Sequence, residues 1–394
     1  MTKLEQLIQE LCPDGVEYKK VKEVYIRLKG TPITAGKMKE ISNPDGDIKV
    51  FAGGKTVINA NLCDIPNANI IRVPAVLVQS RGVIDVIYYD KPFTFKNEMW
   101  AYTTDNNICV KYLYYILKNN IEKFREAAKG MGSLPQISLP VTEDFIIPIP
   151  PLEVQSEIVR ILDKFTELTT ELTTELTNRK KQYEYYRHSI LKLPECNRVT
   201  LDEVFYIRNG YTPSKKQPEY WENGDVQWFR LEDIRQNGRI LTRAIQQINS
   251  KGVKKSGLIK KTSIMMSTTA TLGEHALVCV DYLSNQQITN FTIKEAFQEY
   301  LLPKFAFYCF FDIGEQLATI ANYSGGIPIV DQNKLKKLTL PLPLIEEQRR
   351  IVAILDRFDA LCNDISEGLP AEIEARQKQY EYYRDKLLTF TMKE

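Results

Sequence analysis

The feature that most constrains this sequence is an internal repeat. Residues 147–168 read IPIPPLEVQSEIVRILDKFTEL, and residues 340–361 read LPLPLIEEQRRIVAILDRFDAL, 193 positions later. The match resumes at an offset of 197 between RKKQYEYYR at 179–187 and RQKQYEYYR at 376–384. The second copy therefore carries four extra residues, which is about one helical turn. The repeat predicts a tandem duplication, in which the two halves of the chain share one architecture.

Each copy divides into a variable front of about 150 residues and a helical back. Over residues 154–190, apolar side chains recur at steps of three and four residues, which is typical of a coiled coil. This pattern predicts one helix of about 40 residues, about 60 Å long. The second copy has the same pattern over residues 351–387, but Gly368 and Pro370 should break or kink that helix.

The fronts mix strand-like and helix-like runs. Short β-rich runs occur at 75–78, 263–266 and 276–280, and each front has one amphipathic stretch, at 111–129 and 304–321. These patterns predict an α+β fold. The boundaries that we expect are 1–150 and 194–343 for the fronts, and 151–193 and 344–394 for the long helices.

Composition narrows the class of protein further. The seven cysteines are an odd number without short pair spacings, which argues against a disulfide framework or a zinc site and favours a reducing, cytoplasmic location. No stretch is apolar enough for a signal peptide or a membrane span. Lys and Arg total 52 against 50 for Asp and Glu, so local patches would have to hold any nucleic acid. The small positive excess lies on the fronts, whereas the helices are slightly acidic.

The repeated elements carry a resemblance to a known family. The proline-rich PIPP and PLPL starts, the ILDKF and ILDRF segments and the two QYEYYR segments, together with two dissimilar fronts, resemble the DNA-specificity subunit of a type I restriction–modification system. The resemblance covers essentially the whole chain. The tandem TTEL at 169–176 further resembles the four-residue repeat of one subclass of that family, the IC-like group.

The resemblance implies a protein without catalytic activity, in which two target-recognition domains each read one half of a bipartite target in double-stranded DNA. The implied fold is α+β, with two globular recognition domains of mixed β-structure and helices. Two long helices would separate these domains and form an antiparallel coiled coil, which gives an internal pseudo-twofold duplication. The helices would act as a ruler and dock two modification (methyltransferase) subunits.

The resemblance also implies further partners and their cofactors. Restriction subunits, which translocate DNA, would bind that assembly in turn. S-adenosylmethionine is expected on the modification subunits, and ATP and Mg²⁺ on the restriction subunits. This chain itself is expected to bind no cofactor and no metal, and no membrane. One TTEL unit adds about 6 Å to a helix, which is under two base pairs at about 3.4 Å each, so the gap between half-sites should follow the repeat number.

Candidate DNA-binding residues in the first front lie in two loops. The stretch AGGKT at 52–56 lacks the first glycine of a phosphate-binding loop, since that position is Lys49. Its glycines would instead let the backbone approach DNA phosphate, with Lys55 and Thr56 as donors, unless it is a plain surface turn. Arg81 is the best candidate for a bidentate contact to guanine.

In the second front, candidates are hydroxyl and basic side chains of three segments: residues 207–230, which resemble the opening of a family recognition domain, a lysine cluster, and residues 267–273 after a predicted strand. The cluster of lysines between 251 and 261 fits phosphate contact, although a solvated turn is nearly as good an interpretation. Trp221, Trp228 and Phe229 are expected in the core. The candidate DNA-binding residues here are Thr212, Ser214, Lys215, Lys216, Arg230, Lys254, Lys255, Thr268, Thr269 and Thr271.

The helical backs offer candidate packing and docking residues. Tyrosines at helical spacing are usually core, and a face that stacks on nucleic acid is the alternative. The arginines of these segments would be left for partner subunits or DNA. The spacer and docking residues that we expect are Leu168, Leu172, Leu176, Arg179, Tyr183, Tyr186, Arg187, Arg376, Tyr380, Tyr383 and Arg384.

The sequence offers little for catalysis. His188, on a predicted helix, and His275, in a predicted loop, are the two histidines, too few and too scattered for an acid–base or metal site. The double proline at 150–151 lacks the preceding Asn or Asp and the following aromatic residue of an adenine methyltransferase motif. Two alternatives remain open: an active methyltransferase or nuclease, and a coiled-coil scaffold without sequence-specific DNA binding.

Overall fold

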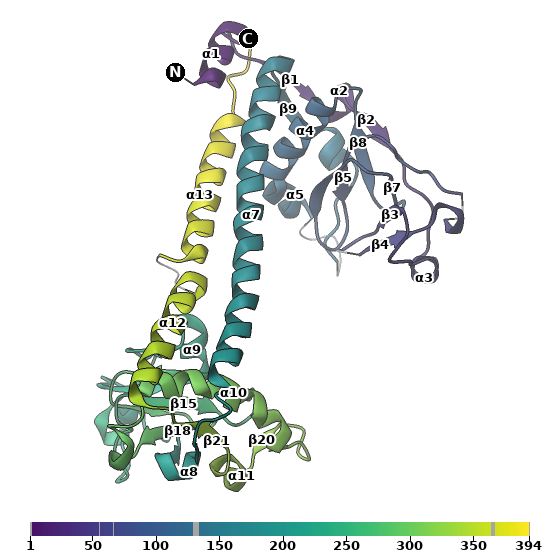
Figure 1. The fold of residues 1–394 in the computed structure, drawn as a ribbon. Helices are drawn as coiled ribbons and strands as arrows, with labels where there is room; N and C mark the ends of the chain where they lie inside the picture. Colours follow the sequence, from purple (N-terminus) through teal and green to yellow (C-terminus); the bar gives the residue numbers. More distant parts are fainter. Residues whose placement is uncertain (1, 55, 66, 129–133, 364–366, 394) are drawn as a thin grey trace. The chain divides into compact units, whose positions relative to one another are not determined.

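The computed structural model describes residues 2–54, 56–65, 67–128, 134–363 and 367–393. The chain forms two compact units. Unit 1 combines the residues up to Thr173 with those from Glu372 onward, and unit 2 runs from Thr174 to Ala371. Each unit therefore joins one front to segments of both helical backs (Figure 1).

Unit 1 contains a four-stranded antiparallel sheet, β2-β8-β5-β6, and a three-stranded sheet, β4-β3-β7, in which β3 and β7 run parallel. Its helix α4 packs against β5 and β6. The strands are β1 (Glu17–Lys20), β2 (Ile26–Leu28), β3 (Ile48–Phe51), β4 (Val57–Ala60), β5 (Ala75–Gln79), β6 (Asp85–Tyr89), β7 (Phe93–Phe95), β8 (Trp100–Thr103) and β9 (Ile146–Ile149). The α-helices that lie wholly before Leu152 are α1 (Lys3–Leu11), α2 (Val21–Val24), α3 (Ala35–Glu40), α4 (Asn107–Asn119), α5 (Ile121–Ala127) and α6 (Pro140–Glu143).

Unit 2 contains a five-stranded sheet, β11-β18-β15-β16-β13, and a three-stranded sheet, β14-β12-β17. Helix α10 packs against β15 and β16. The strands are β10 (Arg198–Thr200), β11 (Phe205–Asn209), β12 (Val226–Phe229), β13 (Ile240–Leu241), β14 (Gln247–Ile248), β15 (Ser263–Ser267), β16 (His275–Val278), β17 (Tyr282–Ser284), β18 (Ile288–Ile293), β19 (Ala321–Asn322), β20 (Ile329–Val330) and β21 (Thr339–Pro341). The helices between them are α8 (Leu201–Val204), α9 (Leu231–Asn237), α10 (Pro303–Ile320) and α11 (Gln332–Lys336).

The two fronts share one topology despite their dissimilar sequences. Strand order β2-β8-β5-β6 corresponds to β11-β18-β15-β16, and the parallel pair β3–β7 corresponds to the parallel pair β12–β17. The antiparallel pair β1–β9 likewise corresponds to β10–β21. The predicted duplication and α+β fold are therefore confirmed. Unit 2 adds β13, which runs parallel to β16 at the sheet edge.

The helical backs differ in continuity, as the sequence predicts. Helix α7 runs unbroken from Leu152 to Leu191, 40 residues, whereas the second back is divided into α12 (Ile345–Asn363) and α13 (Leu369–Leu387) (Figure 1). Threonine is a poor helix former, but hydroxyls in α7 bond to the carbonyl four residues earlier, as Thr169 does to Phe165 at 2.9 Å. None of the described helices, α7 included, is apolar enough over a sufficient length to cross a membrane.

Antiparallel helix packing occurs inside each unit. In unit 1 the ring of Phe165 on α7 stacks on Tyr383 of α13, with centroids 5.6 Å apart, and Tyr380 lies at 6.3 Å. In unit 2 the ring of Phe358 on α12 stacks on Tyr186 of α7, also at 5.6 Å, with Tyr183 at 6.3 Å. The repeated tyrosines therefore pack against the repeated phenylalanines, as expected.

A polar contact anchors each front to its long helix. The Asp163 carboxylate on α7 accepts hydrogen bonds from Lys111 (2.7 Å) and Tyr115 (2.6 Å) of α4. In unit 2, Asp356 on α12 accepts bonds from Lys304 (2.7 Å) and Tyr308 (2.5 Å) of α10. We call these the Lys–Asp–Tyr anchors. Burial and the neighbouring carboxylate raise the pKa of both tyrosines, which therefore remain protonated donors.

Candidate nucleic-acid interface

The loop that follows β5 in unit 1 is held by backbone hydrogen bonds to the segment that precedes α6. The Ser80 carbonyl accepts a bond from the Ile137 amide at 2.9 Å, and the Gly82 amide donates to the Pro135 carbonyl at 2.8 Å. Between these two contacts the side chain of Arg81 is exposed. The backbone is therefore fixed on both sides of Arg81, while its guanidinium reaches solvent.

The loop that follows β15 in unit 2 has the same backbone contacts. The Thr268 carbonyl accepts a bond from the Val330 amide at 2.9 Å, and the Ala270 amide donates to the Pro328 carbonyl at 2.9 Å. Thr269 therefore occupies the place that Arg81 has in unit 1. We call residues 80–82 and 268–270 the strand-end loops.

The left-handed backbone is another property that the strand-end loops share. Gly82 has φ +81° and Ala270 has φ +66°, in a region that favours glycine. The two loops thus present one backbone frame with a different central side chain. Arg81 can donate two bonds to guanine or phosphate, whereas Thr269 offers one hydroxyl and a methyl group.

A second loop of unit 1 lies beside Arg81. The Gly54 amide donates to the Arg81 carbonyl at 2.9 Å, and the Gly53 amide donates to the Glu98 carboxylate at 3.2 Å. Thr56, which follows this loop, is exposed. The structure thus brings the glycine loop and Arg81 together, as a shared DNA-facing surface requires. Lys55, the other residue that we expected here, lies outside the described residues.

One predicted residue of the second strand-end loop is not available at the surface. Thr268 is buried, and its hydroxyl hydrogen-bonds the Thr289 hydroxyl at 2.8 Å. The expectation that Thr268 binds DNA through its side chain is therefore wrong, because the hydroxyl is already paired in the core of the sheet. Thr271 is exposed and Thr269 is half-buried.

The remaining candidates of unit 2 gather around Tyr211. Its phenol oxygen accepts a bond from the Lys254 amide at 2.8 Å, and the Lys254 ammonium lies 4.3 Å from its ring centroid. Its carbonyl accepts a bond from the Trp228 indole at 3.1 Å. Tyr211 therefore brings the loop of Thr212, Ser214, Lys215 and Lys216 next to the loop of Lys254 and Lys255. Apart from Thr212, which is half-buried, these side chains are exposed.

Two residues that organise this surface carry no recognisable signal in the sequence. Tyr211 joins two loops about 40 residues apart in sequence, and Gln286 accepts a hydrogen bond from the Thr212 hydroxyl. Both stand in ordinary polar loops, so only the tertiary contacts reveal their role. The expected core positions of Trp228 and Phe229 are confirmed, and Trp221 is half-buried.

The repeated arginines of the long helices have different surroundings. Arg187 is only 8% exposed, and its guanidinium lies 4.0 Å from the ring centroid of Phe311. The expectation that Arg187 is free for partners is therefore wrong. Its counterpart Arg384 keeps 21% of its side chain exposed and pairs with Asp385. The position that corresponds to Phe311 is Lys118 in the first copy, which offers no apolar ring for stacking.

Of the two histidines, His188 lies on a helix, α7, as expected, whereas the expectation for His275 is wrong. His275 begins strand β16 rather than lying in a loop, and it is fully buried, so that desolvation lowers its pKa to about 3. His188 lies 3.6 Å from Asp312, and with Glu315 they form the group of potential metal ligands found among the described residues. Arg187 lies 3.8 Å from Glu315, and this internal charge pairing accounts for the cluster without an ion.

Comparisons with known proteins define the class. The chain matches the family described as type I restriction modification DNA specificity domain twice, over residues 13–181 and 195–375. The two matches span most of the chain, and one falls on each copy. The protein therefore belongs to the specificity subunits of type I restriction–modification systems, which are non-catalytic.

Individual relatives agree with this assignment. The chain is 40% identical to the EcoR124I/EcoR124II specificity subunit of Escherichia coli, over 73% of this chain and 72% of that one. It is 41% identical to the E. coli EcoprrI specificity subunit, but that match spans only about half of each, 52% of this chain and 53% of the relative. In fold it is similar to the S subunit of M. genitalium, with a TM-score of 0.60 and 15% identity over 95% of this chain and 96% of that one.

Proposed function

We propose that this chain selects the DNA sequence on which a type I restriction–modification complex acts, with one recognition domain for each half of a bipartite target. The observation that carries the proposal is the pair of strand-end loops, which present Arg81 and Thr269 on equivalent backbone frames. If the two domains bind two different half-sites, they need the same loop backbone with different base-contacting side chains, and these loops have that arrangement.

The proposed DNA contacts are the exposed or half-exposed candidates around these loops. In the first domain they are Thr56 and Arg81, and in the second they lie around Tyr211 and beyond β15. Basic and hydroxyl groups there would fix the register on phosphate, while the central loop residues would touch base edges. The contacts proposed for the second domain are Thr212, Ser214, Lys215, Lys216, Arg230, Lys254, Lys255, Thr269 and Thr271.

The proposal includes partners and a location. Two modification subunits carrying S-adenosylmethionine would dock on the long helices, and restriction subunits using ATP and Mg²⁺ would join them, in the cytoplasm. The exposed faces of Arg179, Arg376 and Arg384 and the outer edges of Tyr186 and Tyr383 are the docking groups that remain accessible within each unit. A scaffold without sequence-specific DNA binding leaves the matched strand-end loops unexplained and is not favoured.

Methylation mapping tests the proposal. The chain would be expressed with its modification subunits in a host without other methyltransferases, and the methylated sites would be read across the genome. We expect one bipartite motif for the wild type. Arg81→Ala should relax or change the bases of one half-site only, because a good bidentate base contact contributes about 1–3 kcal/mol of discrimination.

The matched control is Arg72→Ala, which removes another exposed arginine of the same domain. It should leave both half-sites unchanged. A change in neither half-site with Arg81→Ala, or equal changes in both, would contradict the assignment of Arg81. Methylation without any sequence preference in the wild type would instead support the scaffold alternative.

A further inference from the structure

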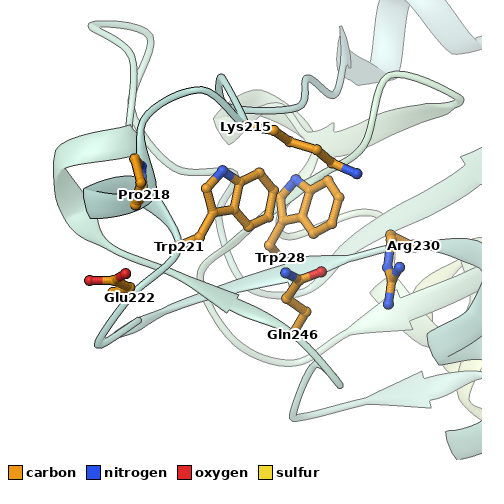
Figure 2. A pocket seen from close by; sticks show the side chains of 7 residues that line it. All are labelled: Lys215, Pro218, Trp221, Glu222, Trp228, Arg230 and Gln246. Atoms are coloured by element: carbon orange, nitrogen blue, oxygen red, sulfur yellow. The ribbon is translucent and has the colours of Figure 1, made fainter.

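A hollow in the second recognition domain lies beside two of the proposed DNA contacts, Lys215 and Arg230. It has a volume of about 360 Å³ and opens beside the loop that carries Lys215. Figure 2 shows two indoles at its centre, with cationic, acidic and amide groups around them. Its lining residues are Lys215, Pro218, Trp221, Glu222, Trp228, Arg230 and Gln246.

The aromatic wall of the hollow is rigidly placed. The Trp221 indole donates to the Ser214 carbonyl at 3.2 Å, and the Trp228 indole donates to the Tyr211 carbonyl. The two rings meet edge to face, with centroids 5.1 Å apart. Because both N–H groups are satisfied by the backbone, what Trp221 offers to the hollow is apolar ring surface, and this residue is only half-buried.

Three polar groups of the hollow have unused hydrogen-bonding capacity. Within the described residues, neither the Lys215 ammonium nor the Gln246 side-chain amide makes a hydrogen bond or ion pair. The Arg230 Nε is buried and unpaired as well, although another nitrogen of that guanidinium lies 3.2 Å from Glu232. Leaving the buried Arg230 Nε unpaired costs free energy, so a ligand that accepts a hydrogen bond from it would bind favourably. The exposed Lys215 ammonium and the half-buried Gln246 amide are accessible to the same ligand.

We infer that this hollow binds one nucleotide of the DNA after its base has left the stack. The inference rests on the proposed function and names a subsite within it. The base would lie against Trp221, and Lys215 and Arg230 would hold its phosphate. Gln246 and Glu222 would face the base edge, where an amide can both donate and accept and a carboxylate accepts from an exocyclic amino group.

The mixture of charges favours a nucleotide over a simple anion. Glu222 would repel a free phosphate or sulfate, whereas a nucleotide can direct its phosphate to Lys215 and Arg230 and its amino group to Glu222. An aromatic wall adds nothing to the binding of an inorganic anion, but it stabilises any nucleobase irrespective of sequence. The hollow also lies beside the loop of Ser214 and Lys216, where the proposed phosphate contacts place the DNA backbone.

The test uses the full-length chain and the four deoxynucleoside 5′-monophosphates as probes. Binding would be measured by saturation-transfer NMR on the base protons, which does not depend on tryptophan as the reporter. We expect saturable binding, weakened about tenfold by Trp221→Leu because base stacking is lost. Lys215→Ala should weaken binding and reduce its salt dependence, and Gln246→Ala should reduce the preference among the four bases.

Matched controls are Lys337→Ala and Gln298→Ala, which remove an exposed lysine and an exposed glutamine elsewhere in the same unit. Both should bind like the wild type. Lys215→Ala and Gln246→Ala change accessible side chains, so they test the inference even if Trp221→Leu folds poorly.

The inference is overturned if no nucleotide binds the wild type, or if Lys215→Ala and Gln246→Ala both bind like the wild type. Loss of assembly with the modification subunits in these variants, with nucleotide binding unchanged, would instead make the hollow a protein-docking site. The assay contains no duplex, so its failure is distinct from failure of the proposed function. The proposed function fails when methylation mapping of the wild type shows no sequence preference, or a motif that is not bipartite.

Discussion

At the scale of single residues, Ala270 keeps the backbone conformation of its counterpart in the first copy although it is not a glycine. It has a left-handed backbone, φ +66°, at the place where the first copy has Gly82. An L-residue with a Cβ pays about 1–2 kcal/mol there, because the Cβ approaches the following carbonyl oxygen. The hydrogen bond from the Ala270 amide to Pro328 holds the residue in place despite that strain.

We expect Ala270→Gly to stabilise unit 2 by about 0.5–1 kcal/mol, since relief of strain outweighs the added flexibility of the unfolded chain. Urea denaturation followed by circular dichroism would measure the change. The reciprocal variant, Gly82→Ala, should destabilise unit 1 through backbone strain, because Gly82 has a left-handed backbone. A steric clash would not add to this, since the nearest atoms to the added Cβ lie at an ordinary contact distance of 3.4 Å. A stability loss in Ala270→Gly would show that the loop is not strained.

His275 is the other residue with a measurable consequence. It is fully buried against Phe307, Phe310 and Phe311, which desolvates the imidazole and lowers its pKa to about 3. An unfolded histidine has a pKa of about 6.5. Between these values the unfolded state binds a proton that the folded state does not. The stability that unit 2 has while this histidine is neutral in both the folded and the unfolded state is therefore fully present above about pH 6.5. It is lost as the pH falls toward 3, because the unfolded state then gains a proton.

As the pH is lowered below about 6, we expect the free energy of unfolding of unit 2 to decrease because of this residue. The decrease should reach at most about 1.4 kcal/mol per pH unit. His275→Leu should remove that part of the slope, and urea unfolding at pH 7.5, 6.5, 5.5 and 4.5 would measure it. Identical slopes in His275→Leu and the wild type would refute this origin of the pH dependence.

At the scale of elements, sequence periodicity predicted the long helices well and the sheets poorly. Helix α7 and the interruption between α12 and α13 follow from local patterns, the apolar repeat and the residues Gly368 and Pro370. The pairing of β12 with β17 and of β13 with β16 joins short strands that are far apart in sequence, so no local pattern encodes it. For the candidate site, the residue type alone made Arg81 a candidate. The role of Tyr211 and the burial of Thr268 depend on tertiary contacts and could not be predicted from the sequence.

The TTEL tandem in α7 gives a prediction at this scale. Deleting residues 173–176 removes about one turn of helix and about 6 Å, so both half-sites should persist while the gap between them shortens by one or two base pairs. Methylation mapping of the deletion variant would show this. Replacing 173–176 with a helix-forming segment of equal length, such as AAEL, should keep the gap. Altered half-sites with an intact gap would contradict the ruler interpretation.

The Lys–Asp–Tyr anchors give a second prediction for elements. Asp356→Asn should weaken two charge-assisted hydrogen bonds between α10 and α12 and destabilise unit 2 by about 1–2 kcal/mol. Asp163→Asn should do the same to unit 1, which makes each variant the control for the other. Hydrogen exchange resolved by segment would assign the loss. Equal destabilisation of both units by one substitution would exclude a local anchor.

At the scale of the whole molecule, the compact units do not follow the order of the sequence. Unit 1 needs the last residues of the chain as well as the first, because α13 packs on Phe165 and the C-terminal segment pairs with the N-terminal one. The Tyr18 hydroxyl donates to the Phe390 carbonyl at 2.7 Å, and the Lys393 amide donates to the Val16 carbonyl at 2.9 Å.

We expect truncation after Ala371 to damage unit 1 and spare unit 2. The truncated chain loses the aromatic stack on Phe165 and the contacts of residues 390–393, so amide protection from hydrogen exchange should fall in unit 1 alone. Adding a synthetic peptide of residues 369–394 should restore it, whereas a scrambled peptide should not. Unchanged protection in unit 1 would show that α13 is dispensable for its fold.

The divided composition of unit 1 also sets an order of events on the ribosome. Domains generally fold as soon as their segments have been synthesised, usually from the N-terminus onward. Here unit 2 is one uninterrupted stretch, so all of its residues emerge before the residues from Glu372 onward that complete unit 1. The part of the protein that is translated first would therefore be the last to finish folding, and its apolar face on α7 would wait for α13 to be made.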